Sequence, residues 1–241
     1  MSLYLALDTA TPFGSVALGT REQLLAELLI GDRRHAAATA GAIEELLAMA
    51  GKGWPDVEGV VLADGPGSFT GLRIGFATAK GLIAARPSLQ LRIAPSLMST
   101  AFAAAAFFKG PIAAVYDALR GEVFAAVYSF EPEGVQEILA PSLTTPDALL
   151  ALPVKPEVAI GDAAILYGDI LARWTGKDAV PPPAGAPRAG ALLSLLGVPG
   201  ATQEIRDPGR LEPNYGRLAE AQRRWEAKHG RPLPGSGSYQ R

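Results

Sequence analysis

One local pattern occurs twice in this chain and limits the folds it can adopt. The pattern is an apolar strand ending in aspartate, a turn that contains glycine, and a second apolar strand. The two copies are Leu3–Asp8 with Gly14–Leu18, and Ile112–Asp117 with Gly121–Tyr128. Each copy predicts a β-hairpin, and the second has the shorter turn. Such turn chemistry also arises in unrelated hairpins, so the pattern alone leaves open whether the chain is duplicated.

Hydrophobic periodicity predicts alternating strands and helices around these hairpins. Further strands are expected at Gln23–Ile30, Val57–Ala63 and Val158–Ile160. Helices are expected at His35–Ala50, Phe69–Ala85 with Ser68 as N-cap, Ala163–Thr175, Gly190–Gly197 and Leu218–His229. The predicted organisation is an α/β protein with halves at 1–108 and 109–229, the second degenerate, and a flexible tail at 230–241.

The composition is typical of a globular protein from a reducing compartment. Hydrophobic residues make up 49% of the 241 residues, enough for a large core. The 22 Lys and Arg are balanced by 24 Asp and Glu, so direct binding to a nucleic-acid backbone is not expected. The chain has no cysteine, no secretory signal and no apolar stretch of about 20 residues. A cytoplasmic protein without a membrane span is therefore expected.

The most specific local motif is the glycine-rich segment Gly65–Gly75. A strand, a glycine turn and a helix start can bind an anion through free backbone N–H groups, although the Gly-Lys-Ser/Thr of a P-loop is absent. The other interpretation is packing, because small residues recur at every fourth position: Gly67, Gly71, Gly75 and Ala79. Interior glycines in this helix cost about 3 kcal/mol in helix propensity, which close approach of another element would offset. That element could belong to this chain or to a partner.

Two aspartates that end the first strand of each hairpin, Asp8 and Asp117, are the candidates for chemistry. They could hold magnesium and phosphates between the halves, or each could cap its own turn. The residues that could form such a phosphate site, active or vestigial, are Asp8, Thr9, Gly14, Ser15 and Asp117. A divalent metal site is not expected, because the two histidines, His35 and His229, have no second histidine four residues away.

Two motifs of this chain resemble those of the bacterial TsaB (YeaZ) family. They are Leu5–Thr11 with its return strand, and Gly65–Gly75; weaker similarity continues at Asp117–Phe124, Ile160–Ala163 and Glu212–Arg217. The resemblance implies a duplicated actin-like, Hsp70-like fold of the ribonuclease H type, which strengthens the case that the two hairpins are related. It also implies a subunit that assists a TsaD-like catalytic subunit and a TsaE-like ATPase in making threonylcarbamoyladenosine in tRNA.

On this resemblance, the chain is expected to be a non-catalytic scaffold that touches tRNA only indirectly. It would hold no cofactor of its own, while ATP and a metal would belong to the partner complex. Ala94–Thr100 contains no histidine, so the paired-His metal motif of the TsaD relative is missing. Two alternatives remain: an independent ATP-dependent phosphotransferase that uses Asp8 and Asp117, and a metallopeptidase, which the lack of ligands disfavours. The C-terminal segment with Trp225 and His229 departs from the short tails expected of the family.

The resemblance also implies docking through the two N-terminal helices, with a TsaD-like subunit or, in its absence, with a second copy of this chain. The stripe of small residues is interpreted as a groove for close helix contact. The predicted contact residues are Thr70, Gly71, Arg73, Ile74, Gly75, Thr78, Ala79 and Leu82 on one helix, and Ile43, Leu46 and Leu47 on the other. If so, Gly75→Leu should block association and leave the chain folded; if the stripe packs internally, leucine should overfill the core.

Overall fold

A computed structural model describes residues 2–30, 35–217 and 228–229 of this chain. The predicted tail at 230–241 and most of the predicted helix Leu218–His229, with Trp225, lie outside these residues. Among the described helices, none is both long and apolar enough to cross a membrane.

Six strands of the described chain form the first sheet. In sheet order they are β10 (Gln203–Glu204), β5 (Gln90–Ala94), β4 (Val57–Ala63), β1 (Leu3–Asp8), β2 (Gly14–Gly19) and β3 (Leu24–Ile30). The first predicted hairpin is present, with Asp8 opposite Ser15 in the antiparallel β1–β2 pair. β4 pairs with β1 in parallel, and β5 pairs with β4 in the same way.

The second sheet repeats the topology of the first. Its strands, in sheet order, are β8 (Gly134–Thr144), β7 (Val123–Glu131), β6 (Ile112–Asp117) and β9 (Val158–Ile160). β6 pairs antiparallel with β7 and parallel with β9, as β1 pairs with β2 and β4. Because strand order and strand directions match, the chain has the duplicated actin-like α/β fold that was predicted, with two related halves.

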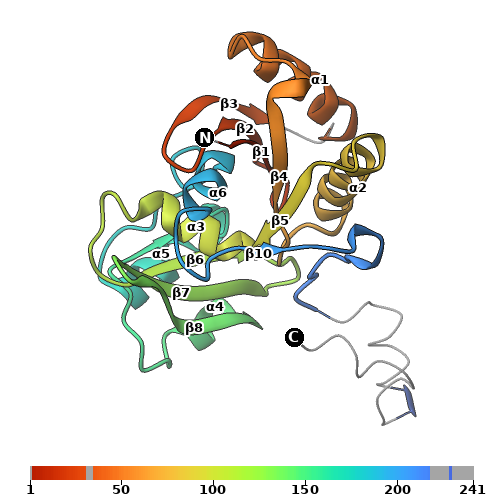
Figure 1. Ribbon diagram of the computed structural model, residues 1–241. Helices are drawn as coiled ribbons and strands as arrows, with labels where there is room; N and C mark the ends of the chain where they lie inside the picture. The colour runs from red at the N-terminus through yellow and green to blue at the C-terminus, as the bar shows by residue number, and fades with distance from the viewer. Residues whose placement is uncertain (1, 31–34, 218–227, 230–241) are drawn as a thin grey trace.

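Helices cover both sheets and also fill the space between them. They are α1 (His35–Met49), α2 (Phe69–Ala85), α3 (Ser96–Ala104), α4 (Pro146–Leu149), α5 (Ala164–Thr175) and α6 (Ala189–Leu195), with short 3-10 turns η1 (Trp54–Asp56) and η2 (Pro208–Arg210). α1 and α2 pack on the outer face of the first sheet, and α3 and α6 lie between the sheets (Figure 1). α4 and α5 cover the outer face of the second sheet.

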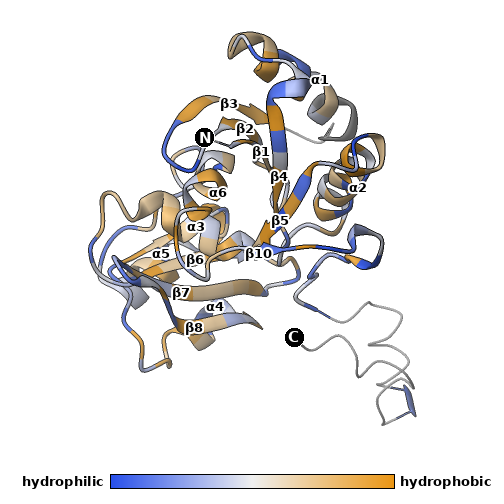
Figure 2. Ribbon diagram, viewed as in Figure 1, coloured by the Kyte–Doolittle hydropathy of each residue, from blue (hydrophilic) through white to orange (hydrophobic). Residues whose placement is uncertain are grey.

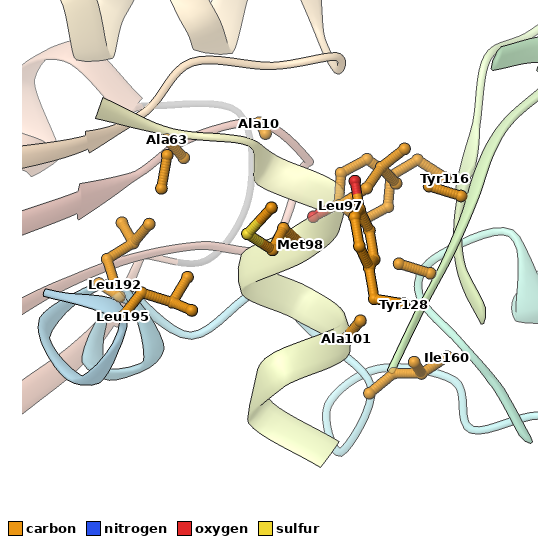
Figure 3. Close-up of a cluster of buried hydrophobic side chains, with 14 of the residues drawn as sticks. Ala10, Ala63, Leu97, Met98, Ala101, Tyr116, Tyr128, Ile160, Leu192 and Leu195 are labelled. Carbon is orange, nitrogen blue, oxygen red and sulfur yellow. The ribbon is translucent and has the colours of Figure 1, made fainter. Parts of the chain in front are cut away.

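Apolar side chains fill the region where the two sheets face each other. α3 runs through this core, with Leu192 and Leu195 of α6 on one side and Tyr116 and Tyr128 of the second sheet on the other (Figure 3). The two tyrosines are at most 1% exposed. In the hydropathy colouring β3 is mainly orange, whereas the chain around η2 is mainly blue (Figure 2). The halves therefore meet through a packed core.

The chain returns to the first sheet after it has completed the second. α6 packs on β1 and β2, and β10 pairs with the edge strand β5. Ser15 Oγ accepts a hydrogen bond from Ala189 N at 2.7 Å and donates one to Pro187 O at 3.3 Å. Residues of the predicted second half thus complete the first sheet, and a division at residues 108 and 109 remains a prediction.

Candidate functional site

The glycines of the segment Gly65–Gly75 lie where α2 packs against its own chain. Ser68 caps the helix as predicted, because its Oγ accepts a hydrogen bond from Gly71 N at 3.3 Å. A Cβ on Gly71 would lie 2.0 Å from Thr9 O, and a Cβ on Gly75 would lie 2.5 Å from Thr9 Oγ1. Such distances are far below van der Waals contact, so only glycine lets the helix approach the turn after β1. The stripe of small residues therefore serves packing within this chain.

This packing involves several residues of the predicted docking surface, which stays a prediction. Gly71, Gly75 and Ala79 face the core of their own chain. The predicted α1 contacts Ile43, Leu46 and Leu47 are also core residues, each at most 4% exposed. These residues pack within their own chain. The four-residue period identified one face of the helix but could not identify what covers that face. Gly75→Leu is consequently expected to overfill the core.

The outer face of α2 carries the remaining predicted contacts. Thr70 and Arg73 are exposed, and Ile74, Thr78 and Leu82 are partly exposed. A shallow hollow of about 340 Å³ lies on this face, lined by Phe69, Thr70, Arg73, Ile74, Ala77 and Thr78. Gly81 is exposed one turn further along, and a Cβ added there would meet nothing within 4 Å. An accessible surface of small and apolar residues suits close contact with another helix.

Asp8 lies in the core at the end of β1. Its carboxylate is 0% exposed, Oδ1 accepts a hydrogen bond from Ala10 N at 3.1 Å, and Oδ2 accepts none within the described chain. Burial raises the pKa of Asp8 to about 7, against the opposing hydrogen bond from Ala10 and with a smaller contribution from the charge of Glu27. Asp8 therefore caps its own turn in a position closed to solvent.

The neighbouring residues of the predicted phosphate site are also engaged within the fold. Thr9 Oγ1 donates a hydrogen bond to Gly71 O at 2.8 Å, and Ser15 binds the backbone before α6. Thr9, Gly14 and Ser15 are buried. These residues do not fit a phosphate group in this conformation, because the donors such a group needs already have partners inside the chain.

Asp117, the counterpart of Asp8, lies beside a carboxylate that sequence reasoning did not single out. Asp117 Oδ1 accepts a hydrogen bond from Leu119 N at 3.0 Å, and Asp117 N donates one to Asp162 Oδ1 at 3.0 Å. Burial raises the pKa of Asp162 to about 7; the bond from Asp117 N opposes this shift, and the Asp117 charge adds to it. β6 ends at Asp117, and Asp162 follows β9 by two residues, so the parallel pairing of these strands is the signal that could have identified the pair.

Metal ligands do not gather around these aspartates. In the described parts of the chain, no group of three or more His, Cys, Asp or Glu residues could hold a metal ion.

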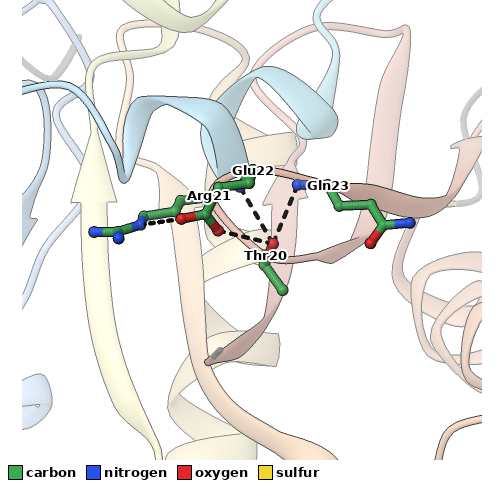
Figure 4. A network of polar contacts seen from close by, with 4 residues as sticks. All are labelled: Thr20, Arg21, Glu22 and Gln23. Carbon is green, nitrogen blue, oxygen red and sulfur yellow. Dashed lines mark hydrogen bonds and ion pairs between the residues drawn. The ribbon is translucent and has the colours of Figure 1, made fainter.

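A second hollow, of about 460 Å³, lies near the β2–β3 turn and is lined by Ser2, Tyr4, Arg21, Glu22, Arg92 and Leu196. Arg21 pairs with Glu22, and Thr20 Oγ1 accepts hydrogen bonds from the backbone N–H groups of Glu22 and Gln23 (Figure 4). Arg92 contacts Glu204 at 3.7 Å. Both cations lining this hollow are thus already paired, which makes the outer face of α2 the stronger candidate site.

Comparisons with known proteins point to one family. A family model described as TsaD, tRNA N6-adenosine threonylcarbamoyltransferase, matches residues 29–175. The chain is 31% identical over 229 residues to the tRNA threonylcarbamoyladenosine biosynthesis protein TsaB of Bacillus subtilis, covering 92% of this chain and 96% of that protein. It is similar to the structure of YeaZ from Pseudomonas aeruginosa, with 26% identity, a TM-score of 0.68 and coverage of 82% and 91%. A second structure from that organism, described as similar to peptidase YEAZ, gives 25% identity, a TM-score of 0.71 and coverage of 90% and 100%.

Proposed function

Because this chain belongs to the TsaB family, we propose that it is a non-catalytic subunit that binds a TsaD-like catalytic subunit for the synthesis of threonylcarbamoyladenosine in tRNA. The outer face of α2 is the observation that supports this proposal most, because its small and apolar side chains leave a hollow open to a partner helix. The inner face of the same helix packs tightly against Thr9 and is not part of this surface. In this proposal, ATP, metal, a TsaE-like ATPase and tRNA all meet the cytoplasmic complex through the partner.

The burial of side chains between the two sheets favours a scaffold function for this chain over a phosphotransferase activity. An enzyme of the latter kind needs carboxylates that reach a metal-bound nucleotide in an accessible cleft. Asp8 is instead fully buried, and Tyr116 and Tyr128 belong to the packed core between the sheets. These positions favour a structural role for the residues of the predicted phosphate site.

We expect the purified chain to hydrolyse no ATP above background in the presence of magnesium. The measurement is phosphate release by wild type and by Asp8→Asn, which retains the shape of the buried side chain. Turnover by wild type that disappears in Asp8→Asn would support the phosphotransferase instead. Activity that is equal in both proteins would indicate a contaminant, since a carboxylate that holds the metal cannot be replaced without loss.

Gly81→Leu is expected to weaken binding to the TsaD-like subunit of the same organism at least about tenfold, or about 1.4 kcal/mol. Leucine would extend from the outer face of α2, where nothing lies within 4 Å of a Cβ, and would hold a partner helix away. The fold should persist, because leucine has a higher helix propensity than glycine. Affinity is measured by titration calorimetry, and folding by thermal melting. Self-association of the free chain, measured by ultracentrifugation, should weaken in the same variant.

Gly168→Leu is the matched control, because Gly168 is also a helical glycine with open space around its Cβ position. It lies in α5, on the outer face of the second sheet, and its substitution should leave the affinity unchanged. Normal binding by Gly81→Leu would exclude this face as the docking surface. Equal losses in both variants would also count against it, since they would indicate a general effect of the added leucine.

A further inference from the structure

A C-terminal segment runs along α2 and continues to the second sheet. This segment, Leu211–Arg217, is here called the strap. Lys80 of α2 lies 3.8 Å from Glu212 Oε1 in an ion pair. Towards the other end of α2, Asn214 N donates a hydrogen bond to Asp64 O at 2.8 Å. In Figure 1 the blue chain after β10 passes beside α2. The strap is therefore attached to α2 at Lys80 and to the loop before this helix at Asp64.

The end of the strap is held by the β6–β7 hairpin. A Cβ on Gly216 would lie 2.6 Å from Phe124 Cε1, so the backbone there packs directly on the ring. Arg217 places its guanidinium 5.2 Å from the Phe124 ring centroid and 3.9 Å from Glu122 Oε2. It also donates a hydrogen bond to Ala118 O. These contacts fix the position of Tyr215, which lies between the two attachments.

Tyr215 forms part of a cluster at the rim of the α2 hollow. Its ring stacks on Phe69 with centroids 4.7 Å apart and an interplanar angle of 29°. The Arg73 guanidinium carbon lies 5.0 Å from the Phe69 ring centroid. Although it belongs to this stack, Phe69 remains 56% exposed, and Arg73 is also exposed. The Phe69 ring thus contacts the cation at an accessible surface, and the Tyr215 ring stacks on Phe69.

Among the described residues, Arg73 has no acidic partner for its charge. In the described residues, no carboxylate lies within ion-pair distance of its guanidinium. The other residues that line the hollow, Phe69, Thr70, Ile74, Ala77 and Thr78, are all uncharged. A planar guanidinium held against a ring has lost side-chain freedom and presents its donors as a fork, which is the geometry that binds a carboxylate with two hydrogen bonds.

We propose that Arg73, supported by Phe69 and Tyr215, recognises a carboxylate side chain on an otherwise apolar helix of the TsaD-like subunit. This inference rests on the proposed function and adds the strap to the docking surface. The apolar hollow would receive the helix, and the single ion pair would set its register. Phe69 and Tyr215 act as positioning residues, because they hold the guanidinium and need not contact the carboxylate themselves.

The test compares affinities for the TsaD-like subunit at about 0.05 M and 0.5 M salt, which screen exposed charges very differently. We expect Arg73→Gln to bind about tenfold more weakly at low salt and to lose most of the salt dependence that wild type shows. Arg73→Lys keeps the charge without the planar fork and should fall between them. Tyr215→Ala should weaken binding about threefold, and Tyr215→Phe, which keeps the stacked ring, should restore it. Thermal melting of each variant verifies folding.

The outcomes separate this inference from the proposed function. Wild-type affinity and salt dependence in Arg73→Gln would overturn carboxylate recognition and leave the docking face intact. A loss of affinity with an unchanged salt dependence would also overturn it, since Arg73 would then act through its bulk. Failure of wild type to bind the TsaD-like subunit at all would overturn both proposals.

Discussion

Adding a single methyl group at Gly71 is expected to lower the free energy of unfolding by at least about 3 kcal/mol. In Gly71→Ala the new Cβ would lie 2.0 Å from the backbone oxygen of Thr9, which cannot rotate away. Either α2 or the turn after β1 must then move. For a chain of this length, the loss corresponds to a decrease in melting temperature of about 6 to 12 °C. Urea unfolding and thermal melting both measure the effect.

Gly81→Ala is the control in the same helix and should change stability in the opposite direction. With no atom within 4 Å of the new Cβ, only helix propensity acts, and alanine gains up to about 1 kcal/mol. Equal melting temperatures for Gly71→Ala and Gly81→Ala would show that the stripe is not packed against the first hairpin. Gly71, Gly75 and Ala79 would then be tested again as contacts with a partner helix.

Replacing Asp8 by asparagine is expected to stabilise the protein at high pH. Burial raises the pKa of Asp8 to about 7 in the folded chain, whereas an unfolded aspartate has a pKa of about 3.9. The folded state therefore binds this proton more tightly than the unfolded state. The stability that results is fully present below about pH 4 and is lost as the pH rises through about 7. Asparagine has no charge to bury, so it avoids this loss and can retain the bond from Ala10 N.

The effect of Asp8→Asn should be about 2 to 3 kcal/mol more stabilising at about pH 8 than at about pH 5. Urea unfolding of wild type and variant at both pH values measures this difference. Asp162→Asn should change stability in the same direction, because burial also raises the pKa of Asp162 to about 7. Equal destabilisation by Asp8→Asn at both pH values would contradict a buried charge and indicate that the carboxylate is needed for its shape or its contacts.

Local patterns in the sequence predicted much of the fold because they report burial and turns directly. The helix at Phe69–Ala85 and the strands at Val57–Ala63 and Val158–Ile160 have the predicted bounds. Both hairpins are also present. The elements β5, β8, β10, α3 and α4 were not predicted. Of these, α3 and β8 carry no strong period in their apolar residues. α6 was predicted as a helix, but its return to the first sheet depends on contacts far apart in sequence.

The candidate site was harder to predict for the same reason. The spacing of Gly71 and Gly75 correctly showed that they share one helix face, yet only the position of Thr9 shows that this face is internal. Asp162 joins Asp117 through strand pairing, and Tyr215 joins Phe69 across most of the chain. Such neighbours cannot be derived from local periodicity, which carries no information about distant segments.

The hydrogen bond between Ala189 and Ser15 joins residues 174 positions apart, and this separation affects how the protein is made. A ribosome that adds about 5 to 20 residues per second needs roughly 10 to 35 seconds to synthesise that interval. Throughout that time, the face of β1 and β2 that α6 will cover lacks this helix. This hairpin thus leaves the ribosome long before the helix that covers its inner face, so a nascent chain released before α6 would expose that face to solvent and to chaperones.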